Sequence, residues 1–214
     1  MSWLTRLLAG HADAPPLDAE LRALLADWNR LPPPDLGKSH FETRYVVLNT
    51  ECSGLDVERS RLLGVAAIAI ESGTLAPSTS YHAELDADPT AVLAELLTFS
   101  ASGPIVVYNA ALNRVMLERA FERHLGVTPE WLWLDLYWLL PALFRERIDI
   151  PTRLADWMRA FDVELFEHRH ALGDAYAIAQ LMLALESRAL ARGLASPHAL
   201  AEAERARRQL SGRI

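Results

Sequence analysis

The spacing of apolar residues near the start of the chain predicts a helix. Between residues 17 and 31 apolar side chains recur every three or four positions, with charged residues between them, which is typical of an amphipathic helix. Prolines at 32–34 end this helix and begin a stiff connector. We therefore expect residues 1–42 to form a helical arm with a proline-rich connector. The apolar stripe consists of Leu17, Leu21, Leu24, Leu25, Trp28 and Leu31.

From Arg44 onward the pattern predicts strands first and helices later. Apolar runs at 45–48 and 62–70 indicate strands, and shorter strands are expected near 80–85 and 104–107. A leucine-rich segment at 132–143 indicates a short strand or turn that passes into a helix with Pro141 in its first turns. This order predicts one α/β domain over residues 43–214. Further helices are expected at 90–99, 111–125, 152–160, 172–191 and 197–210.

Asp135 and three tryptophans lie within or beside this leucine-rich segment. We interpret Asp135 as the cap of the helix that follows it. Indole rings at 131, 133 and 138 are able to stack on nucleic-acid bases. Their apolar neighbours favour packing in the core instead.

Composition limits the classes of function. With 214 residues and 51% apolar content, the chain is able to bury the core of one domain plus an extension. A formal charge of −7 argues against a broad grip on duplex DNA, but allows a small contact with a nucleic-acid end. Only Lys38 among the 21 basic residues is lysine, which is typical of a bacterial gene of high GC content.

Cysteine content and hydropathy bear on the compartment. Cys52 is the one cysteine, which excludes an intramolecular disulfide and a cysteine-rich zinc site and is consistent with a reducing cytoplasm. The first ten residues carry no convincing secretion signal, and no apolar run approaches the roughly 18 residues of a membrane span. We expect a soluble, cytoplasmic protein without membrane association.

Three short motifs carry candidate chemistry. The strand at 45–48 leads into Asn49 and Glu51, whose side chains share one face of the strand because they are two positions apart. A second motif, Tyr108-Asn109-Ala-Ala-Leu-Asn113, joins a strand to a helix. The third motif is His168-Arg169-His170-Ala-Leu-Gly-Asp174, in a loop that leads into a helix. Open α/β sheets place their active sites at such strand ends.

Taken together, the three motifs resemble those of the Asp-Glu-Asp-Asp-His 3'-5' exonucleases, the DnaQ-like family that includes DNA polymerase III epsilon-like proofreading subunits. The resemblance implies an α/β fold of the ribonuclease-H-like type, with a mixed five-stranded sheet flanked by helices. It places the catalytic positions at Asn49, Glu51, Asn113, Arg169 and Asp174. It places substrate-binding positions at Cys52, Ser53, Gly54, Leu55, Tyr108, Asn109, His168 and His170.

Only Glu51 and Asp174 match the family's catalytic residues. The implied mechanism uses two Mg²⁺ or Mn²⁺ ions about 4 Å apart, held by four carboxylates. Each carboxylate that becomes an amide removes an attraction on the order of 8 kcal/mol before desolvation, at an effective dielectric near 20. Arginine at 169 stays protonated and cannot act as the base. We therefore expect a weak or absent metal site at Glu51 and Asp174, and no bound ion.

These replacements favour a catalytically impaired protein that binds a nucleic-acid 3' end or a nucleotide, or that serves as a scaffold. In this interpretation Arg169 pairs with Glu51 or Asp174 in place of the metal. One alternative is an active exonuclease on DNA or RNA ends, in which His168 or His170 supplies the base. The other is a protein-interaction module or homodimer formed through residues 17–31, although packing of that stripe on its own domain is the more common arrangement.

Overall fold

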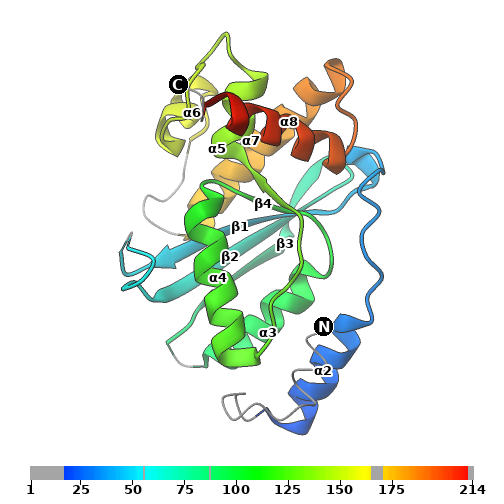
Figure 1. Ribbon diagram of the computed structural model, residues 1–214, viewed down its shortest axis with the longest axis vertical. Helices are drawn as coiled ribbons and strands as arrows, with labels where there is room; N and C mark the ends of the chain where they lie inside the picture. Colours follow the sequence, from blue (N-terminus) through cyan, green and yellow to red (C-terminus); the bar gives the residue numbers. More distant parts are fainter. Residues whose placement is uncertain (1–16, 55, 87, 165–170, 212–214) are drawn as a thin grey trace.

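Five strands form the sheet at the centre of the protein, and helices cover both of its faces (Figure 1). The computed structural model describes residues 17–54, 56–86, 88–164 and 171–211. The strands are β1 (Tyr45–Cys52), β2 (Leu62–Glu71), β3 (Thr74–Glu84), β4 (Ile105–Val107) and β5 (Trp133–Asp135). The helices are α2 (Ala19–Asn29), the 3-10 turn η1 (His40–Glu42), α3 (Pro89–Ser100), α4 (Ala110–Leu125), α5 (Leu136–Leu143), α6 (Leu154–Ala160), α7 (Ala171–Ala191) and α8 (Pro197–Ser211).

The sheet is mixed, with strand order β3-β2-β1-β4-β5. β1 pairs antiparallel with β2 and parallel with β4, and β4 pairs parallel with β5. Ser72 and Gly73 join β2 to β3 with φ angles of 51° and 67°, as a tight hairpin turn of the primed type requires. The expected mixed five-stranded sheet is confirmed. Its three parallel strands end at the same edge, which gathers the motifs of the sequence there.

Alternation along β1 explains why the sheet needs a layer on each face. Tyr45 and Val47 point to one face, Val46 and Leu48 to the other, and all four are fully buried. The first face packs against α5 and α7, and the second against α3 and α4 (Figure 1). A strand apolar on both faces is therefore the central strand of the sheet.

The N-terminal helix α2 packs on α3 of its own domain. Leu25 is buried, and Leu17, Leu21, Leu24 and Trp28 pack against the same apolar cluster, so only Leu31 of the expected stripe is exposed. The Trp28 indole also donates to the carbonyl of Ala101, with 3.2 Å between the atoms. The stripe therefore packs on its own domain, and dimerisation through residues 17–31 has little apolar surface left to use.

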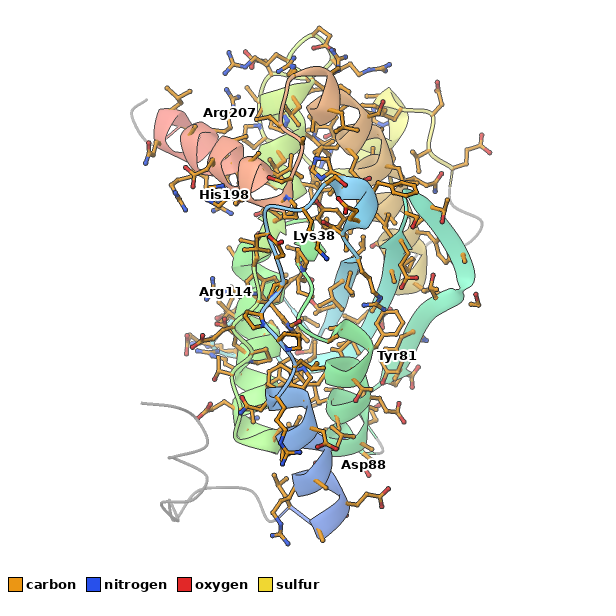
Figure 2. All side chains as sticks on the ribbon, turned by 90° about the vertical axis from the view of Figure 1, so that its right-hand side faces the viewer. Lys38, Tyr81, Asp88, Arg114, His198 and Arg207 are labelled. Atoms are coloured by element: carbon orange, nitrogen blue, oxygen red, sulfur yellow. The ribbon has the colours of Figure 1, made fainter. Side chains whose placement is uncertain are left out.

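The connector runs along the molecule from α2 to the start of α8, past Lys38 and towards His198 (Figure 2). At one end the Ser102 hydroxyl donates to the carbonyl of Pro32, over 2.9 Å. At the other end the backbone N–H of His198 donates to the carbonyl of Leu36, over 3.1 Å. The connector is therefore tied to the domain at both ends.

Two expectations about single elements need correction. β3 begins at Thr74, because the tight turn pairs it with β2 well before the expected start near residue 80. Pro141 lies near the end of α5 and not in its first turns. The helix starts at Leu136 because the Asp135 carboxylate accepts the N–H of Tyr137 over 3.0 Å and so caps the helix there.

The three tryptophans of this region pack against other side chains of the protein. Trp131 is buried with its ring edge-on to Phe121, and Trp133 packs edge-on to Trp131. Trp138 lies beneath the guanidinium of Arg208, 5.3 Å from ring centroid to cation. Trp131 and Trp133 therefore belong to the apolar core as expected, whereas Trp138 is half-buried beneath Arg208. Within the described ranges, no helix is long and apolar enough to cross a membrane.

A buried acid lies near Tyr45 of β1. Glu186 of α7 is 6% exposed, and its Oε1 atom has no hydrogen-bond partner among the described residues. Its charge acts on Tyr45, whose hydroxyl lies 2.6 Å from Nδ1 of His40. The His40 Nε2 atom lies 2.8 Å from the carbonyl of Leu194, so Nε2 carries the proton and Nδ1 accepts from Tyr45. Burial raises the pKa of Glu186 to about 7 and lowers the pKa of His40.

We expect Glu186 to lower the stability of the protein as the pH rises. In the unfolded chain its carboxyl ionises near pH 4.5, but in the folded protein it ionises only near pH 7. With respect to this group, the folded protein is therefore most stable below pH 4.5, and it loses stability as the pH rises to 7. The free energy of unfolding of Glu186→Gln minus that of the native protein should therefore rise by about 2 to 3 kcal/mol from pH 5 to pH 8. Urea unfolding at both pH values measures this, and an unchanged difference would contradict it.

Candidate functional site

Four of the five predicted catalytic positions meet at the carboxyl end of β1. Asn49 and Glu51 come from the strand, Asn113 from α4 and Asp174 from the first turn of α7. Hydrogen bonds join β1 to both helices in this region. The motifs therefore gather as the resemblance implied. The fifth position, Arg169, lies outside the described residues together with Leu55, His168 and His170, so its pairing with Glu51 or Asp174 stays a prediction.

Asn113 has every hydrogen bond that its amide is able to make. Its Oδ1 atom accepts from the backbone N–H and the hydroxyl of Thr50, over 3.1 and 2.9 Å. Its Nδ2 atom donates to the carbonyls of Tyr108 and Asn109, over 2.9 and 3.1 Å. The N–H of Thr50 is a donor, which fixes the oxygen of the amide on that side. Because the side chain is 4% exposed and saturated, it has no lone pair to offer to a metal ion.

Asn49 and Glu51 both bond to the first residue of α7. The Asn49 amide donates to the carbonyl of Ala171 over 3.3 Å, and Oε1 of Glu51 accepts the N–H of Ala171 over 2.7 Å. An acid is favourable at a helix start because the first N–H groups lack partners within the helix. Glu51 lies against Gly64 of β2, where an added Cβ atom would be 3.3 Å from Oε2. The glycine thus leaves the space that the carboxylate occupies.

Asp174 is the second acid of the site and is half-buried. Burial raises its pKa, and the charge of Glu51 raises it further, which places the two carboxylates within electrostatic reach of each other. Within the described ranges, no three His, Cys, Asp or Glu side chains gather as metal ligands. Two carboxylates, one of them bonded to a backbone N–H, and a saturated amide are a poor donor set for two divalent ions.

Asp135 fixes the position of α4 and therefore of Asn113. Its carboxylate is 2% exposed and accepts the N–H groups of Asn109 and Ala110, each over 2.9 Å, besides that of Tyr137. Burial raises the pKa of Asp135. The cap predicted from the sequence is confirmed, and it serves two helices. Asn109 is held in the left-handed region with φ 68°, where asparagine is better tolerated than most residues.

Helix α8 supports this cap from behind. The Glu204 carboxylate accepts the backbone N–H of Asp135 over 2.8 Å. Arg208 bonds to both acids, over 2.8 Å to Glu204 and 3.1 Å to Asp135. Arg208, near the end of the chain, is thus paired with acids of the protein although its side chain is partly exposed. Arg205 and Arg207 likewise pair with Glu202 and Asp149.

A pocket of about 450 Å³ opens beside Asn49 and Asn113. Tyr108 forms one wall with its ring edge-on to Tyr137, and its hydroxyl donates to the carbonyl of Thr152. Residues of the first two predicted motifs and of the loop before α6 line the pocket together. The sequence did not indicate that this loop belongs to the site. The described lining residues are Asn49, Thr50, Tyr108, Asn109, Leu112, Asn113, Tyr137, Thr152, Arg153, Leu154 and Ile178.

Cys52, Ser53 and Gly54 lie at the end of β1 and do not line this pocket. Burial raises the pKa of the Cys52 thiol, which lies 3.7 Å from the Thr50 hydroxyl. The Ser53 hydroxyl accepts the N–H of Arg61 over 3.0 Å, so it closes the turn between β1 and β2. Their expected contact with substrate stays a prediction.

Structures of E. coli exonuclease I share this fold. A zinc-bound complex with single-stranded DNA matches with a TM-score of 0.58 and 17% identity, over 68% of this chain and 41% of that one. A complex with a dA16 oligonucleotide matches with a TM-score of 0.56 and 16% identity, over 68% and 41%. A further structure of exonuclease I matches with a TM-score of 0.52 and 16% identity, over 74% of this chain and 42% of that one. The likeness at these identities establishes the fold, over less than half of the length of exonuclease I.

The sequence comparisons add no closer relationship. No protein-family model matches the chain, and no curated protein matches it. The structural matches to exonuclease I alone support the ribonuclease-H-like fold that the three motifs implied.

We expect Asn113→Asp to destabilise the protein. The new carboxylate oxygen would face the carbonyls of Tyr108 and Asn109 in place of the donor that now bonds to them. Two lost hydrogen bonds and a buried charge without a partner should cost about 3 kcal/mol in free energy of unfolding. Urea unfolding in EDTA measures the cost.

Asn49→Asp is the matched control, because the Asn49 amide loses only the bond of 3.3 Å to Ala171. We expect it to cost about 1 kcal/mol or less. Equal losses in the two variants would show that the bonds of Asn113 have no special weight.

Proposed function

We propose that this protein binds the 3' end of single-stranded nucleic acid, or a nucleotide, in the pocket beside Asn113, and that it has lost two-metal hydrolysis. The saturated amide of Asn113 is the observation on which the proposal rests. The motif of the exonucleases has an aspartate at this position, and such a carboxylate would hold a metal ion. Here the side chain bonds β1 to the start of α4 instead.

Electrostatics point the same way. Two divalent ions carry a charge of +4, and four carboxylates would offset most of it. Glu51 and Asp174 supply only −2, and Oε1 of Glu51 already accepts the N–H of Ala171. Hard ions such as Mg²⁺ prefer carboxylate oxygen and water to a neutral amide. A two-ion site built from these residues would therefore be weak.

Two observations support nucleic acid as the ligand class. The E. coli exonuclease I structures that share the fold include complexes with single-stranded DNA and with a dA16 oligonucleotide. In this chain the pocket lies at the carboxyl end of β1 and has tyrosine rings and amide groups in its walls. Aromatic rings beside hydrogen-bonding groups are suited to bases and sugars.

An active exonuclease is the second candidate, and the two acids favour it. Asp174 has a raised pKa partly because Glu51 lies within electrostatic reach, and such a pair is able to hold one ion. Glu51→Gln and Asp174→Asn each remove one of these charges with little change of shape. They separate the two candidates directly.

We expect the protein to bind labelled single-stranded oligonucleotides equally well in EDTA and in Mn²⁺, without shortening them. Fluorescence anisotropy measures the binding, and denaturing gels measure the length. DNA and RNA strands of one sequence should be tested in parallel. Shortening in Mn²⁺ that Glu51→Gln or Asp174→Asn abolishes would establish the exonuclease instead. If neither strand binds at micromolar protein, and a nucleoside monophosphate does not bind either, the binding proposal is wrong.

Mn²⁺ should stabilise a variant with the family's residues and not the native protein. The variant is Asn49→Asp, Asn113→Asp and Arg169→His, which restores two carboxylates and a base. Binding at ten times the dissociation constant adds about 1.4 kcal/mol to the free energy of unfolding. Thermal unfolding in EDTA and in millimolar Mn²⁺ measures the shift. An equal shift in the native protein would contradict the loss of the two-ion site.

A further inference from the structure

We propose that Arg153 binds the phosphate of the nucleotide and so supplies the positive charge that metal ions would provide in a two-ion exonuclease site. The inference rests on the proposed function and adds to it the chemical group recognised, a phosphate monoester or diester on a nucleoside. It needs no metal ion and involves no covalent step. From the sequence alone, no residue of the loop before α6 was predicted to bind phosphate.

Charge in the pocket is the first support. Among the eleven described residues that line it, Arg153 is the only one whose side chain is charged at neutral pH. The formal charge of the whole protein is −7, so the charge of Arg153 is opposite in sign to the net charge of the protein. A divalent cation would be repelled by this guanidinium, whereas phosphate would be attracted. The lining thus favours an anion.

The loop that carries Arg153 is held against the pocket by neighbouring bonds. The Tyr108 hydroxyl donates to the carbonyl of Thr152, which fixes the residue just before Arg153. The Thr152 hydroxyl donates in turn to Asp156 in the first turn of α6. A cation on a tethered loop loses less conformational freedom on binding than one on a free loop. Arg153 is therefore both charged and well placed.

The guanidinium of Arg153 remains available to a ligand. Its side chain is 85% exposed, and its ion pair with Asp156 is loose, with 3.8 Å between Nε and Oδ2. Asp156 is shared with the Thr152 hydroxyl and with Arg159. The two arginines and one aspartate sum to +1, so Asp156 does not neutralise the group. A phosphate would meet a guanidinium with most of its hydrogen-bonding capacity unused.

The rest of the pocket suits the nucleoside. Asn109 is exposed, and its side chain makes no capping bond, so its amide is free to meet a base or sugar. The rings of Tyr108 and Tyr137 provide an aromatic wall, and Leu112 adds apolar surface. About 450 Å³ lies within the range of pockets that hold small ligands. The expected ligand is a nucleoside monophosphate or the terminal nucleotide of a strand.

Calorimetric titration of the whole protein with deoxyadenosine monophosphate, in EDTA, tests this inference. We expect binding without metal, and an affinity about 10-fold to 100-fold lower in Arg153→Gln, the usual size of a lost charge-assisted hydrogen bond. Arg153→Lys, which keeps the charge, should restore part of the loss. Arg145→Gln is the matched control, because Arg145 is exposed and also has a loose ion pair of 3.8 Å, but lies outside the pocket. It should bind as the native protein does.

Two further ligands identify the source of the phosphate. A single-stranded oligonucleotide that also weakens with Arg153→Gln places the terminal nucleotide of a strand on Arg153. If only the monophosphate weakens, the free nucleotide is the ligand of Arg153, and in both cases the inference holds. Equal affinities of the native protein and Arg153→Gln for both ligands would overturn the inference and leave the proposed function intact. No binding of either ligand to the native protein would overturn both.

Discussion

The architecture of the site depends on one buried carboxylate, that of Asp135. It accepts N–H groups at the start of both α4 and α5, and Glu204 and Arg208 of α8 hold it in place. A carboxylate that is 2% exposed is tolerated because donors surround it. The start of α4 is therefore fixed relative to β5, and with it the side chain of Asn113. Asp135 thus positions residues that line the pocket, although it does not line the pocket itself.

With α4 fixed in this way, the site has two acids, Glu51 and Asp174, and a neutral amide at Asn113 in place of a third. The Asn113 amide is hydrogen-bonded to Thr50 and to two carbonyls at the start of α4, and the Glu51 carboxylate accepts the first N–H of α7. Bonds within the protein thus do the positioning that metal ions perform in a two-ion site. Among the described residues that line the pocket only Arg153 is charged, because Glu51 and Asp174 lie outside its lining. Such a lining suits the anionic ligand that we propose.

The sheet and the meeting of the motifs were predictable because both depend on local patterns. Alternation along β1 gives a strand buried on two faces, and polar residues at the ends of parallel strands must share an edge. Arg153 was not predictable, because a loop far along the chain reaches the pocket only through Tyr108 and Thr152, and no local spacing encodes that contact. Pro141 shows the same limit, since the cap at Asp135 and not the proline sets the start of α5. Leu112 also lines the pocket, and its place within the second motif could have indicated this from the sequence.

Asp135 and Asn113 show why an acid persists at one buried position and an amide at the other. The Asp135 carboxylate accepts hydrogen bonds from three N–H groups and a guanidinium. Asn113 meets two donors on Thr50 and two acceptors at the start of α4, so only a group that both accepts and donates satisfies all four. A carboxylate there would need a cation or a proton against the carbonyls. The amide at position 113 therefore satisfies surroundings that a carboxylate would leave partly unsatisfied.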